Sequence, residues 1–452
     1  MLYLQNTLTG DKEKFIPIEK NKVGIYVCGV TLYDHIHIGH LKSILTFEIL
    51  RNYFAFTGFK VKFVRNITDI DDKIISKAVN EGISPLTLVN QYIDHYHNLL
   101  DSLEINLPDE EPRVTQYLPK ISQYIENLES KGFAYKAADG IYFNTATIKN
   151  KIYPLSKKVI NDLQESEDNK LYDKKNASDF ALWKKDISHG YSSNIFNENG
   201  RPGWHIECSA MHYHTLGENF DIHGGGRDLI FPHHENEITQ SVAHNGISPA
   251  NYWIHNGMMT KDGKKLSKSL GNSIYVKDLL HDYSPEGIKL FLLKGQYNQS
   301  QEFSVIELKE AHERIMGFMS VLSDLKDNQF ISFRNEIIDI LEDNLNTPKA
   351  VVLIYQKIKE LQENKSLGLA LELLEVLKLL SVIGKNQSLD TLYQKWLTSN
   401  LPTQNVINLA EFRKTAKLSN DWISADQYRL EINKLGWLIN DQKNGDYLLQ
   451  KM

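Results

Sequence analysis

The chain has 452 residues, of which 41% are hydrophobic and 24% charged, with a formal net charge of −6. This length predicts more than one domain, and the mildly negative charge disfavours a strongly basic nucleic-acid coat. No apolar run approaches the roughly 20 residues that span a bilayer, and the early charged residues do not fit a signal peptide, so we expect a cytoplasmic protein with no membrane partner. Two cysteines are too few for a disulfide framework.

The first elements in chain order predict a βαβ unit. Residues 23–29 form a short apolar run typical of a buried strand, residues 39–58 have the pattern of a helix that ends at Gly58, and residues 59–67 read as a second strand. Such a unit has parallel strands and a right-handed crossover. Ligands bind at the carboxyl ends of parallel strands, where Cys28 and the loop after it are expected to lie.

The middle of the chain predicts an insertion followed by the second half of the sheet. Residues 115–200 combine a helical segment, short strands and a polar stretch. From residue 201 the sequence again has patterns typical of regular secondary structure. They include a helix that we expect to begin at Pro232 and end at Gly246. Residues 251–258 then read as another strand.

The last third of the chain is predicted to be mostly helical. Residues 307–385 have helical periodicity and very few Gly or Pro, which indicates a helical bundle. Residues 386–405 read as a linker. Residues 406–452 predict a small terminal unit of two helices and a hairpin.

The motif HIHIGH, residues 35–40, directly follows the first strand. His37 and His40 are three residues apart and share one face of a helix that begins here, and Gly39 allows a ligand to approach the backbone closely. The dipole and the free N–H groups of a helix N-terminus, with imidazoles beside them, indicate a phosphate site. The motif alone leaves open a polar loop that is merely rich in histidine.

A second motif, GMMTKDGKKLSKSLGN, occupies residues 257–272. Lys265 and Lys268 are three residues apart, between Gly263 and Gly271, in what reads as a mobile loop. Such a loop can place cations on a polyphosphate as negative charge builds during a displacement. A solvated lysine-rich turn is the alternative.

A third set of residues has the chemistry of a metal site. His233 and Glu237 are spaced i, i+4 and face the same way on one helix. With Cys28 and Cys208 they provide two thiolates, an imidazole and a carboxylate, which suit tetrahedral Zn(II). Each cysteine could instead be a packing residue. The H-x-E pattern at residues 205–207 does not indicate a zinc deaminase, because that family also needs a later P-C-x-x-C.

Together, HIGH at residues 37–40 and KLSKS at residues 265–269 resemble the two signatures of the class I aminoacyl-tRNA synthetases. Further stretches resemble the cysteinyl-tRNA synthetase family: YVCG, KVKFVRNITDIDDKII, RPGWHIECSAM and FDIHGGGRDLIFPHHENEI. The resemblance implies an α/β fold, with a split Rossmann-type parallel-sheet catalytic domain, an inserted connective domain, a helical bundle and a small C-terminal anticodon-binding domain. The implied division is 1–114 and 201–257 for the catalytic halves, 115–200 for the insertion, 258–306 for the KLSKS loop and stem-contact region, 307–385 for the bundle, 386–405 for the linker and 406–452 for the anticodon-binding domain.

The resemblance also implies a function and its residues. The expected reaction joins L-cysteine to its cognate tRNA, with a GCA anticodon, through a cysteinyl adenylate made from ATP. One Zn(II) per chain would recognise the substrate thiol, Mg(II) would accompany ATP, and the chain would be a monomer. The implied residues are His37, His40, Lys265 and Lys268 for catalysis; His37, Gly39, His40 and Lys268 for ATP; Gly29, Thr68 and Trp204 for the amino-acid pocket; and Cys28, Cys208, His233 and Glu237 for zinc.

Two rival functions share some of these motifs. A ligase that joins activated cysteine to an amino sugar would carry the same metal and nucleotide motifs, but it would lack the terminal unit. A catalytically silent tRNA-binding paralogue is disfavoured by the intact His and Lys motifs. The sequence also departs from many relatives in having Leu41 and Lys42 after HIGH, where they carry a small residue and Arg, and Leu266 in place of Met.

Overall fold

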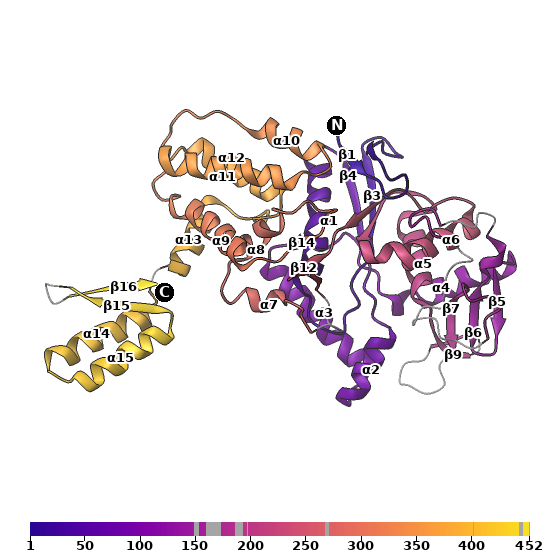
Figure 1. Cartoon of the computed structure of the whole chain (residues 1–452), viewed down its shortest axis with the longest axis horizontal. Coiled ribbons are helices and arrows are strands. Elements are labelled where there is room, and N and C mark those ends of the chain that lie inside the picture. Colours follow the sequence, from indigo (N-terminus) through magenta and orange to yellow (C-terminus); the bar gives the residue numbers. More distant parts are fainter. Residues whose placement is uncertain are drawn as a thin grey trace. The chain divides into compact units, whose positions relative to one another are not determined.

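The computed structural model describes most of the chain (Figure 1). The described residues are 1–148, 153–159, 173–185, 193–196, 198–266, 271–400, 402–442 and 446–451. They form two compact units. The first unit comprises Met1–Glu313, Ser332–Lys357 and Glu375–Lys385, and the second comprises Arg314–Ile331, Ile358–Leu374 and Asn386–Met452.

A four-stranded parallel sheet forms the centre of the first unit. Its strand order is β11-β10-β3-β4, with β3 at Lys22–Val27, β4 at Lys60–Arg65, β10 at Phe220–Gly226 and β11 at Ala250–Asn256. Helix α1, Ile38–Phe56, connects the parallel strands β3 and β4, so the predicted βαβ unit is confirmed. Because β3 and β10 pair in parallel, two segments nearly 200 residues apart end at the same edge of the sheet.

Local capping sequences explain where the helices beside the sheet begin and end. Helix α2, Asp72–Glu81, begins after Asp71, whose carboxylate accepts a hydrogen bond from the Lys73 amide, and ends at Gly82 with φ 67°. Helix α3, Pro85–Ser102, has Ser84 as its N-cap and proline at its first position. These short signals place α2 and α3 after the carboxyl end of β4.

The insertion forms an antiparallel sheet of its own, in the order β5-β6-β7-β9-β8. Its strands are Ala134–Ala137, Gly140–Phe143, Phe180–Lys185, Ser193–Ile195 and Glu198–Pro202 for β5 to β9. The buried residues of this sheet, including Phe143 and Trp183, share a hydrophobic core with α4, Val114–Ser130, and α5, Trp204–Leu216. The insertion is therefore packed against the β10–β11 half of the parallel-sheet domain.

The predicted helix at Pro232 begins later than expected. The regular helix α6 is Glu235–Asn245 and ends at Gly246, which has φ 87°. Phe231 has extended backbone angles, φ −134° and ψ 130°, so residues 230–234 form an irregular turn before the helix. The sequence pattern did not reveal this turn, because its apolar and histidine residues continue the period of the helix.

The remaining elements of the first unit are short. They are β1 at Tyr3–Gln5 and β2 at Lys12–Lys14, which pair antiparallel; β12 at Met259–Lys261, β13 at Lys264–Lys265 and β14 at Gln301–Glu302; and the helices α7 at Val276–Leu279 and α8 at Pro285–Leu292.

Further helices follow: α9 at Val305–Ser320, α10 at Arg334–Glu342, α11 at Thr347–Asn364, α12 at Leu367–Leu379 and α13 at Leu389–Asn400. Of these, α9, α11 and α12 each cross a boundary between the two units, whereas α10 lies in the first unit and α13 in the second. Among the residues described, no helix combines the length and the apolar character needed to cross a bilayer.

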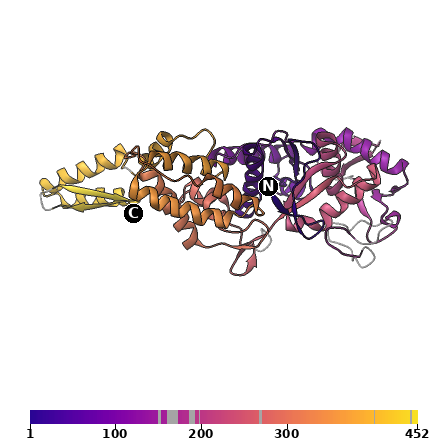
Figure 2. The ribbon, with the colours of Figure 1, turned by 90° about the horizontal axis from the view of Figure 1, so that it is seen from above.

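The end of the second unit has the predicted two helices and hairpin. Helices α14, Gln404–Leu418, and α15, Trp422–Lys434, lie side by side and are followed by the antiparallel strands β15, Trp437–Asp441, and β16, Tyr447–Lys451 (Figures 1 and 2). Residues of α14, α15 and β15 share a small apolar core. A bidentate ion pair between Arg413 and Asp441, at 2.7 and 3.1 Å, joins α14 to β15.

Candidate active site

A cleft of about 500 Å³ opens at the carboxyl ends of β3, β4, β10 and β11. This is the edge at which the parallel topology predicts a ligand site. The sequence-predicted residues that line it are Cys28, Gly29, His37, Gly39, His40, Thr68, Trp204, Cys208, His233 and Lys265. Glu237 lies fully buried behind this wall. Lys268 falls outside the described residues.

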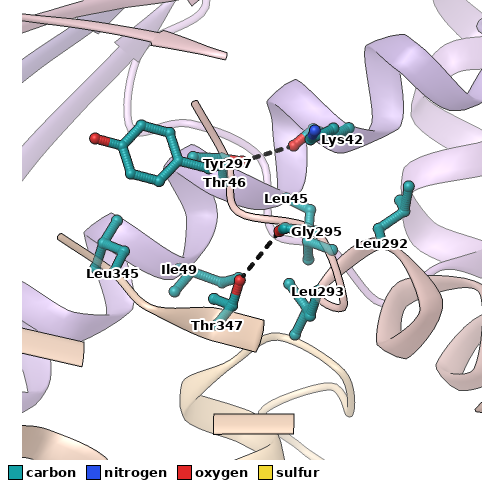
Figure 3. A pocket seen from close by; sticks show the side chains of 10 residues that line it. All are labelled: Lys42, Leu45, Thr46, Ile49, Leu292, Leu293, Gly295, Tyr297, Leu345 and Thr347. Atoms are coloured by element: carbon teal, nitrogen blue, oxygen red, sulfur yellow. Dashed lines mark hydrogen bonds between the residues drawn. The ribbon is translucent and has the colours of Figure 1, made fainter. Parts of the chain in front are cut away.

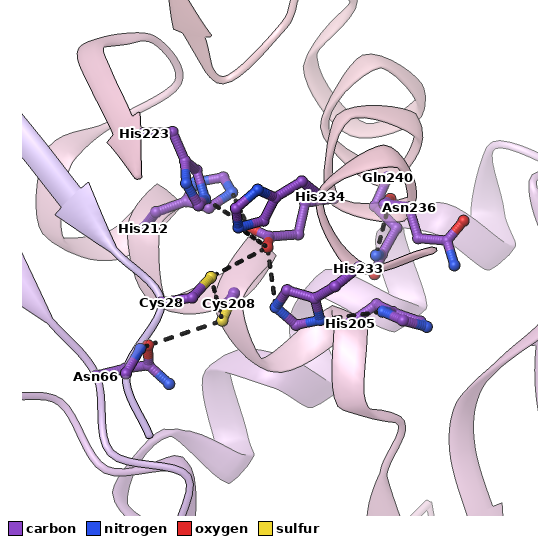
Figure 4. Close-up of polar contacts among 12 residues, drawn as sticks. Cys28, Asn66, His205, Cys208, His212, His223, His233, His234, Asn236 and Gln240 are labelled. Atoms are coloured by element: carbon purple, nitrogen blue, oxygen red, sulfur yellow. Dashed lines mark hydrogen bonds and ion pairs between the residues drawn. The ribbon is translucent and has the colours of Figure 1, made fainter. Parts of the chain in front are cut away.

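At one end of the cleft, Cys28, Cys208, His233 and Glu237 bring their ligand atoms within 4.8 Å of one another (Figure 4). The two sulfur atoms are 3.5 Å apart, and Glu237 Oε1 lies 3.4 Å from Cys28 Sγ and 3.0 Å from His233 Nε2. Zinc bonds of about 2.0–2.3 Å place the ligands of a tetrahedral site about 3.3–3.8 Å from one another. The donor set and its spacing therefore fit a zinc ion.

The cluster combines two buried anions with a buried imidazolium. Burial alone would raise the pKa of Glu237, but His223 and His233 outweigh it and hold that pKa well below its usual value. Burial also opposes ionisation of Cys208, yet the hydrogen bond from Cys28 and the charge of His233 lower its pKa to about 6. Against the effect of burial, Glu237 and Cys208 raise the pKa of His233 to about 10. The site thus attracts positive charge, which a divalent cation would supply in place of the proton.

A second combination shares two of these ligands. Cys28, His223, His234 and Glu237 also have ligand atoms within 4.8 Å of one another. However, His223 and His234 are fully buried and do not line the cleft, whereas Cys208 and His233 do. Only the first set would hold a metal that a ligand in the cleft can reach.

The side chains around the cluster orient its members. His223 Nε2 lies 2.8 Å from Glu237 Oε2. The other carboxylate oxygen, Oε1, therefore faces the sulfur atoms. His205 Nδ1 lies 3.1 Å from His233 Nδ1, and burial and the charge of His233 lower the pKa of His205 well below its usual value. A neutral His205 accepts the proton of His233 Nδ1, which leaves Nε2 for a metal.

The other predicted pocket residues surround the same end of the cleft. The Trp204 ring lies 4.3 Å from that of His233 at an angle of 32°. Gly29 donates its amide to Asn66 Oδ1 at 2.9 Å, and a Cβ at Gly29 would lie 1.6 Å from the Asn66 carbonyl oxygen. Only glycine allows this approach of the loops after β3 and β4. Thr68 is buried in the same loop, in an isolated backbone bridge to Thr31.

At the other end of the cleft, the two HIGH histidines cap helix α1. His37 Nδ1 accepts hydrogen bonds from the amides of Gly39 and His40, and His40 Nδ1 accepts one from the His37 amide. The rings stack with centroids 3.7 Å apart. Because both Nδ1 atoms are acceptors, each neutral ring carries its proton on Nε2.

The expectation of free N–H groups at this helix terminus was wrong. The Ile38 amide donates to the Ile274 carbonyl at 2.9 Å, and the amides of Gly39, His40 and Leu41 all have acceptors on His37. The reason is that the histidines themselves satisfy the terminal donors. An anion bound here would be stabilised by the imidazole Nε2–H groups and the helix dipole rather than by unpaired amides.

The KLSKS segment begins at the end of a short strand, and residues 267–270 of the predicted loop lie outside the described residues. Lys264–Lys265 pairs with Met259–Lys261 across a two-residue turn, in which Asp262 and Gly263 have φ of 53° and 71°. Asp-Gly favours such a turn. Lys265 Nζ reaches Asp228 Oδ2 at 3.2 Å, so Asp228 and Lys265 face each other across the cleft mouth.

Lys42 does not take the place of a phosphate-binding arginine. It is buried on α1, where its ammonium donates to the Gln299 carbonyl at 2.8 Å, and burial and the nearby Arg227 lower its pKa to about 8. Lys42 borders a separate apolar cavity between α1 and the segment after α8 (Figure 3). That cavity has a volume of about 10 Å³, which is room for one water molecule.

Sequence reasoning missed two residues that line the cleft, Asn66 and Asp228, and two buried behind its wall, His205 and His223. Asn66, Asp228, His205 and His223 orient or face the predicted residues, and each lies within three residues of a recognised motif or strand end. Asn66 and Asp228 follow the carboxyl ends of β4 and β10, and this position could have indicated that they line the cleft. No local signal indicated His205 or His223, because each acts through a residue that is distant in the sequence.

Comparison with known proteins identifies the family to which the chain is similar. Residues 14–313 match the family model described as the tRNA synthetases class I (C) catalytic domain. The cysteine–tRNA ligase of Histophilus somni (strain 2336) is 38% identical over 461 residues, covering 98% of this chain and 99% of the relative. That of Burkholderia multivorans (strain ATCC 17616 / 249) is 36% identical over 456 residues, covering 98% of both.

Solved structures show the fold alone at much lower identity. Mycobacterium tuberculosis methionyl-tRNA synthetase in complex with methionyl-adenylate aligns with a TM-score of 0.55 at 12% identity, over 80% of this chain and 90% of that one. A leucyl enzyme from Agrobacterium radiobacter, in a ternary complex with tRNA, aligns with a TM-score of 0.54 at 11% identity, over 85% of this chain and 86% of that one.

Proposed function

The chain belongs to the class I aminoacyl-tRNA synthetases, in the cysteine–tRNA ligase family, and from this premise we propose that it activates L-cysteine with ATP and transfers it to its cognate tRNA. The observation that carries the proposal is a thiolate-rich donor cluster at the wall of a cleft that also holds HIGH and Lys265. An amino acid and ATP bound in one cleft would have their reacting groups close together.

Zn(II) is the metal that the donor set suits best. Cys28, Cys208, His233 and Glu237 would hold one ion per chain. When bound, it would supply a Lewis-acid position that favours the thiolate form of the substrate. His205 and His223 would orient the imidazole and carboxylate ligands. Gly29, Thr68 and Trp204 would form the walls around the cysteine side chain.

The activation step needs positioning and charge stabilisation rather than a protein nucleophile. The cysteine carboxylate attacks the α-phosphate of ATP, which gives cysteinyl adenylate and releases pyrophosphate. His37 and His40 would donate their Nε2–H groups to the phosphates, beside the positive end of the α1 dipole. Gly39 would let the nucleotide approach. Lys265 and Lys268 would balance the charge of the departing pyrophosphate, and Mg(II) would accompany the nucleotide.

Transfer follows by a second displacement. A ribose hydroxyl at the 3′ end of the tRNA attacks the adenylate carbonyl, and AMP leaves. The terminal part of the second unit would read the GCA anticodon. It has exposed aromatic side chains beside cations, such as Trp422, 58% exposed, with Lys417 Nζ 5.8 Å from its ring centroid. Such pairs bind unpaired bases by stacking. We expect the active form to be a monomer.

Selectivity for cysteine would come from the metal end of the cleft. A site that must be completed by a thiolate can reject an analogue that lacks the thiol by on the order of 10⁴-fold. Serine would fit the cavity but would offer a poorly acidic, hard oxygen in place of sulfur. A separate editing site would then be unnecessary.

A charging assay tests this function directly. Zinc-loaded protein should catalyse cysteine-dependent ATP–pyrophosphate exchange and should attach cysteine to tRNA with a GCA anticodon. Exchange without charging would instead support an amino-sugar acceptor. Folded, zinc-loaded protein that shows no exchange would contradict both enzymatic functions and would favour a silent tRNA-binding paralogue.

A further inference from the structure

A group of rings lies beside the mouth of the cleft and takes no part in the activation step described above. His35 comes from the loop after β3, Tyr92 and His95 from α3, and Tyr275 from the residue before α7. Helices α2, α3 and α7 lie toward the lower side of the first unit in Figure 1. We call His35, Tyr92, His95 and Tyr275 the ring cluster.

The rings of this cluster contact one another and remain open to solvent. His35 stacks on His95 with ring centroids 5.1 Å apart and planes at 26°. It makes T-shaped contacts with Tyr92 and Tyr275, whose ring centroids lie 5.5 and 6.5 Å from its own. His95 is exposed, and the other three are half-buried. A group that served only to pack the core would be buried.

The ring cluster is continuous with the cleft. Tyr33 and Lys73 line the cleft itself. Lys73 and Lys77 are four residues apart on α2 and so lie on the same face of that helix. Lys77 Nζ in turn donates to Tyr92 OH at 2.7 Å and lies 4.6 Å from the centroid of its ring. A molecule that leaves the cleft past Tyr33 and Lys73 therefore meets the ring cluster next.

Cations and acids both lie beside the rings, including Asp278 near Tyr275, and two of the acids are engaged by other groups. Burial, Lys277 and His95 lower the pKa of His35, with a further effect from Lys77. Asp34 accepts a hydrogen bond from Tyr275 OH at 3.0 Å, and Glu81 lies 3.7 Å from Lys77 Nζ. The combination offers faces for bases and cations for phosphates, which is the chemistry that binds unpaired nucleotides.

We propose that the ring cluster, with Lys77 and Lys277, receives the unpaired 3′ nucleotides of the tRNA as their terminal ribose enters the cleft. The proposal rests on the proposed tRNA charging function, and it adds the surface that guides the acceptor end. The bases stack on the exposed ring faces, and the lysines contact the phosphates. ATP and cysteine do not need this surface, because their proposed contacts lie farther into the cleft.

The test uses the full-length, zinc-loaded chain and the double variant Lys77→Ala/His95→Ala. Binding is measured to tRNA with a GCA anticodon, either intact or with its unpaired 3′ nucleotides removed. The wild type should bind the truncated tRNA about tenfold more weakly, since stacked bases each contribute appreciably to affinity. The double variant should bind both tRNAs alike, with about a tenfold loss of kcat/KM for tRNA charging and wild-type pyrophosphate exchange.

A matched control has the same kind of contact elsewhere. Lys120 Nζ lies 4.2 Å from the Tyr117 ring centroid on α4, and Lys120→Ala should behave as the wild type does in every assay. The inference is overturned if the double variant still distinguishes the two tRNAs as the wild type does, or if it loses pyrophosphate exchange. Absence of exchange in the wild type would instead refute the proposed function itself.

Discussion

The two ends of the cleft hold their functional groups in different ways. At the metal end, Cys28 and Glu237 are 209 residues apart in the chain, yet their side chains meet at 3.4 Å beside a buried imidazole. At the phosphate end, His37 and His40 are held by reciprocal bonds within one helical turn, and Lys265 is 45% exposed. The metal end depends on the tertiary fold, whereas the two histidines of the phosphate end are held by local sequence.

This difference follows from what each end must bind. A buried site that takes up a cation needs anions that the fold forces together, because their repulsion must be offset by metal or proton. A site for a polyphosphate needs donors that solvent and a large charged ligand can reach. The predictions below test whether the two ends fail independently, from the largest expected effect to the smallest.

Removing a thiolate should disable the metal end alone. We expect Cys208→Ser to lose its zinc and to lower cysteine-dependent exchange by more than about 100-fold, because changes even to outer-shell partners typically cost 10–100-fold. Elemental analysis and the exchange assay measure the two effects. Ser209→Ala, at a buried neighbouring position on α5, is the control and should keep its zinc. Full zinc content in Cys208→Ser would remove Cys208 from the ligands.

Two variants of His37 should separate capping from phosphate binding at the other end. Asparagine is a good N-cap but has no Nε2–H donor, so His37→Asn should keep the free energy of unfolding while exchange falls on the order of 100-fold. His37→Ala should lose the same activity and also about 1 kcal/mol of stability. Denaturant unfolding and exchange kinetics compare them, and both variants should keep zinc. Normal exchange in His37→Asn would show that the imidazole serves only as a cap.

Zinc binding at the metal end should release protons. The pKa of His233 is raised to about 10, and burial with the hydrogen bond to Cys208 raises the pKa of Cys28 well above its usual value, so at neutral pH both hold protons that a metal displaces. Zinc affinity should therefore rise by about 100-fold per pH unit from pH 7 to 9. Below about pH 6, Cys208 also takes up a proton and the dependence steepens. Calorimetry in buffers of different ionisation enthalpy counts the protons, and binding without proton release would contradict the account.

Substitution of Trp204, in the wall of the amino-acid pocket, should have the smallest effect on activity. Trp204→Ala removes the ring that lies against His233, and an aromatic pair of this kind contributes about 0.5–1.5 kcal/mol. We expect KM for cysteine to rise by up to about tenfold, with zinc content and KM for ATP unchanged. Trp396→Ala, which removes a tryptophan stacked on Tyr393 in α13, is the control. An equal rise in KM for ATP would show that Trp204 does not belong to the metal end alone.

The same contrast explains what could be predicted from the sequence. The strand, helix and strand around HIGH followed from local periodicity, as did the terminal pair of helices with their hairpin. The grouping of Cys28 with Cys208, His233 and Glu237 followed from ligand chemistry and from the family resemblance. Their distances depend on the pairing of β3 with β10, which no local pattern specifies.

Other features could not be predicted because they arise from contacts between distant segments. Asn66 is placed by the close approach of two loops at Gly29. The late start of α6 depends on an irregular turn whose residues continue the helical pattern. The strand that carries Lys265 depends on the left-handed turn at Asp262 and Gly263 and on pairing with β12, which itself pairs with the distant strand β14.

The central claim is that the metal end of the cleft selects the substrate by its thiol. Pyrophosphate exchange with cysteine and with serine, on the same protein before and after zinc removal, tests it most directly. We predict that the zinc-loaded protein prefers cysteine by on the order of 10⁴-fold, and that removal of zinc abolishes most of this preference together with the cysteine activity. Comparable exchange with both amino acids in the zinc-loaded protein, or an unchanged preference after zinc removal, would contradict the claim.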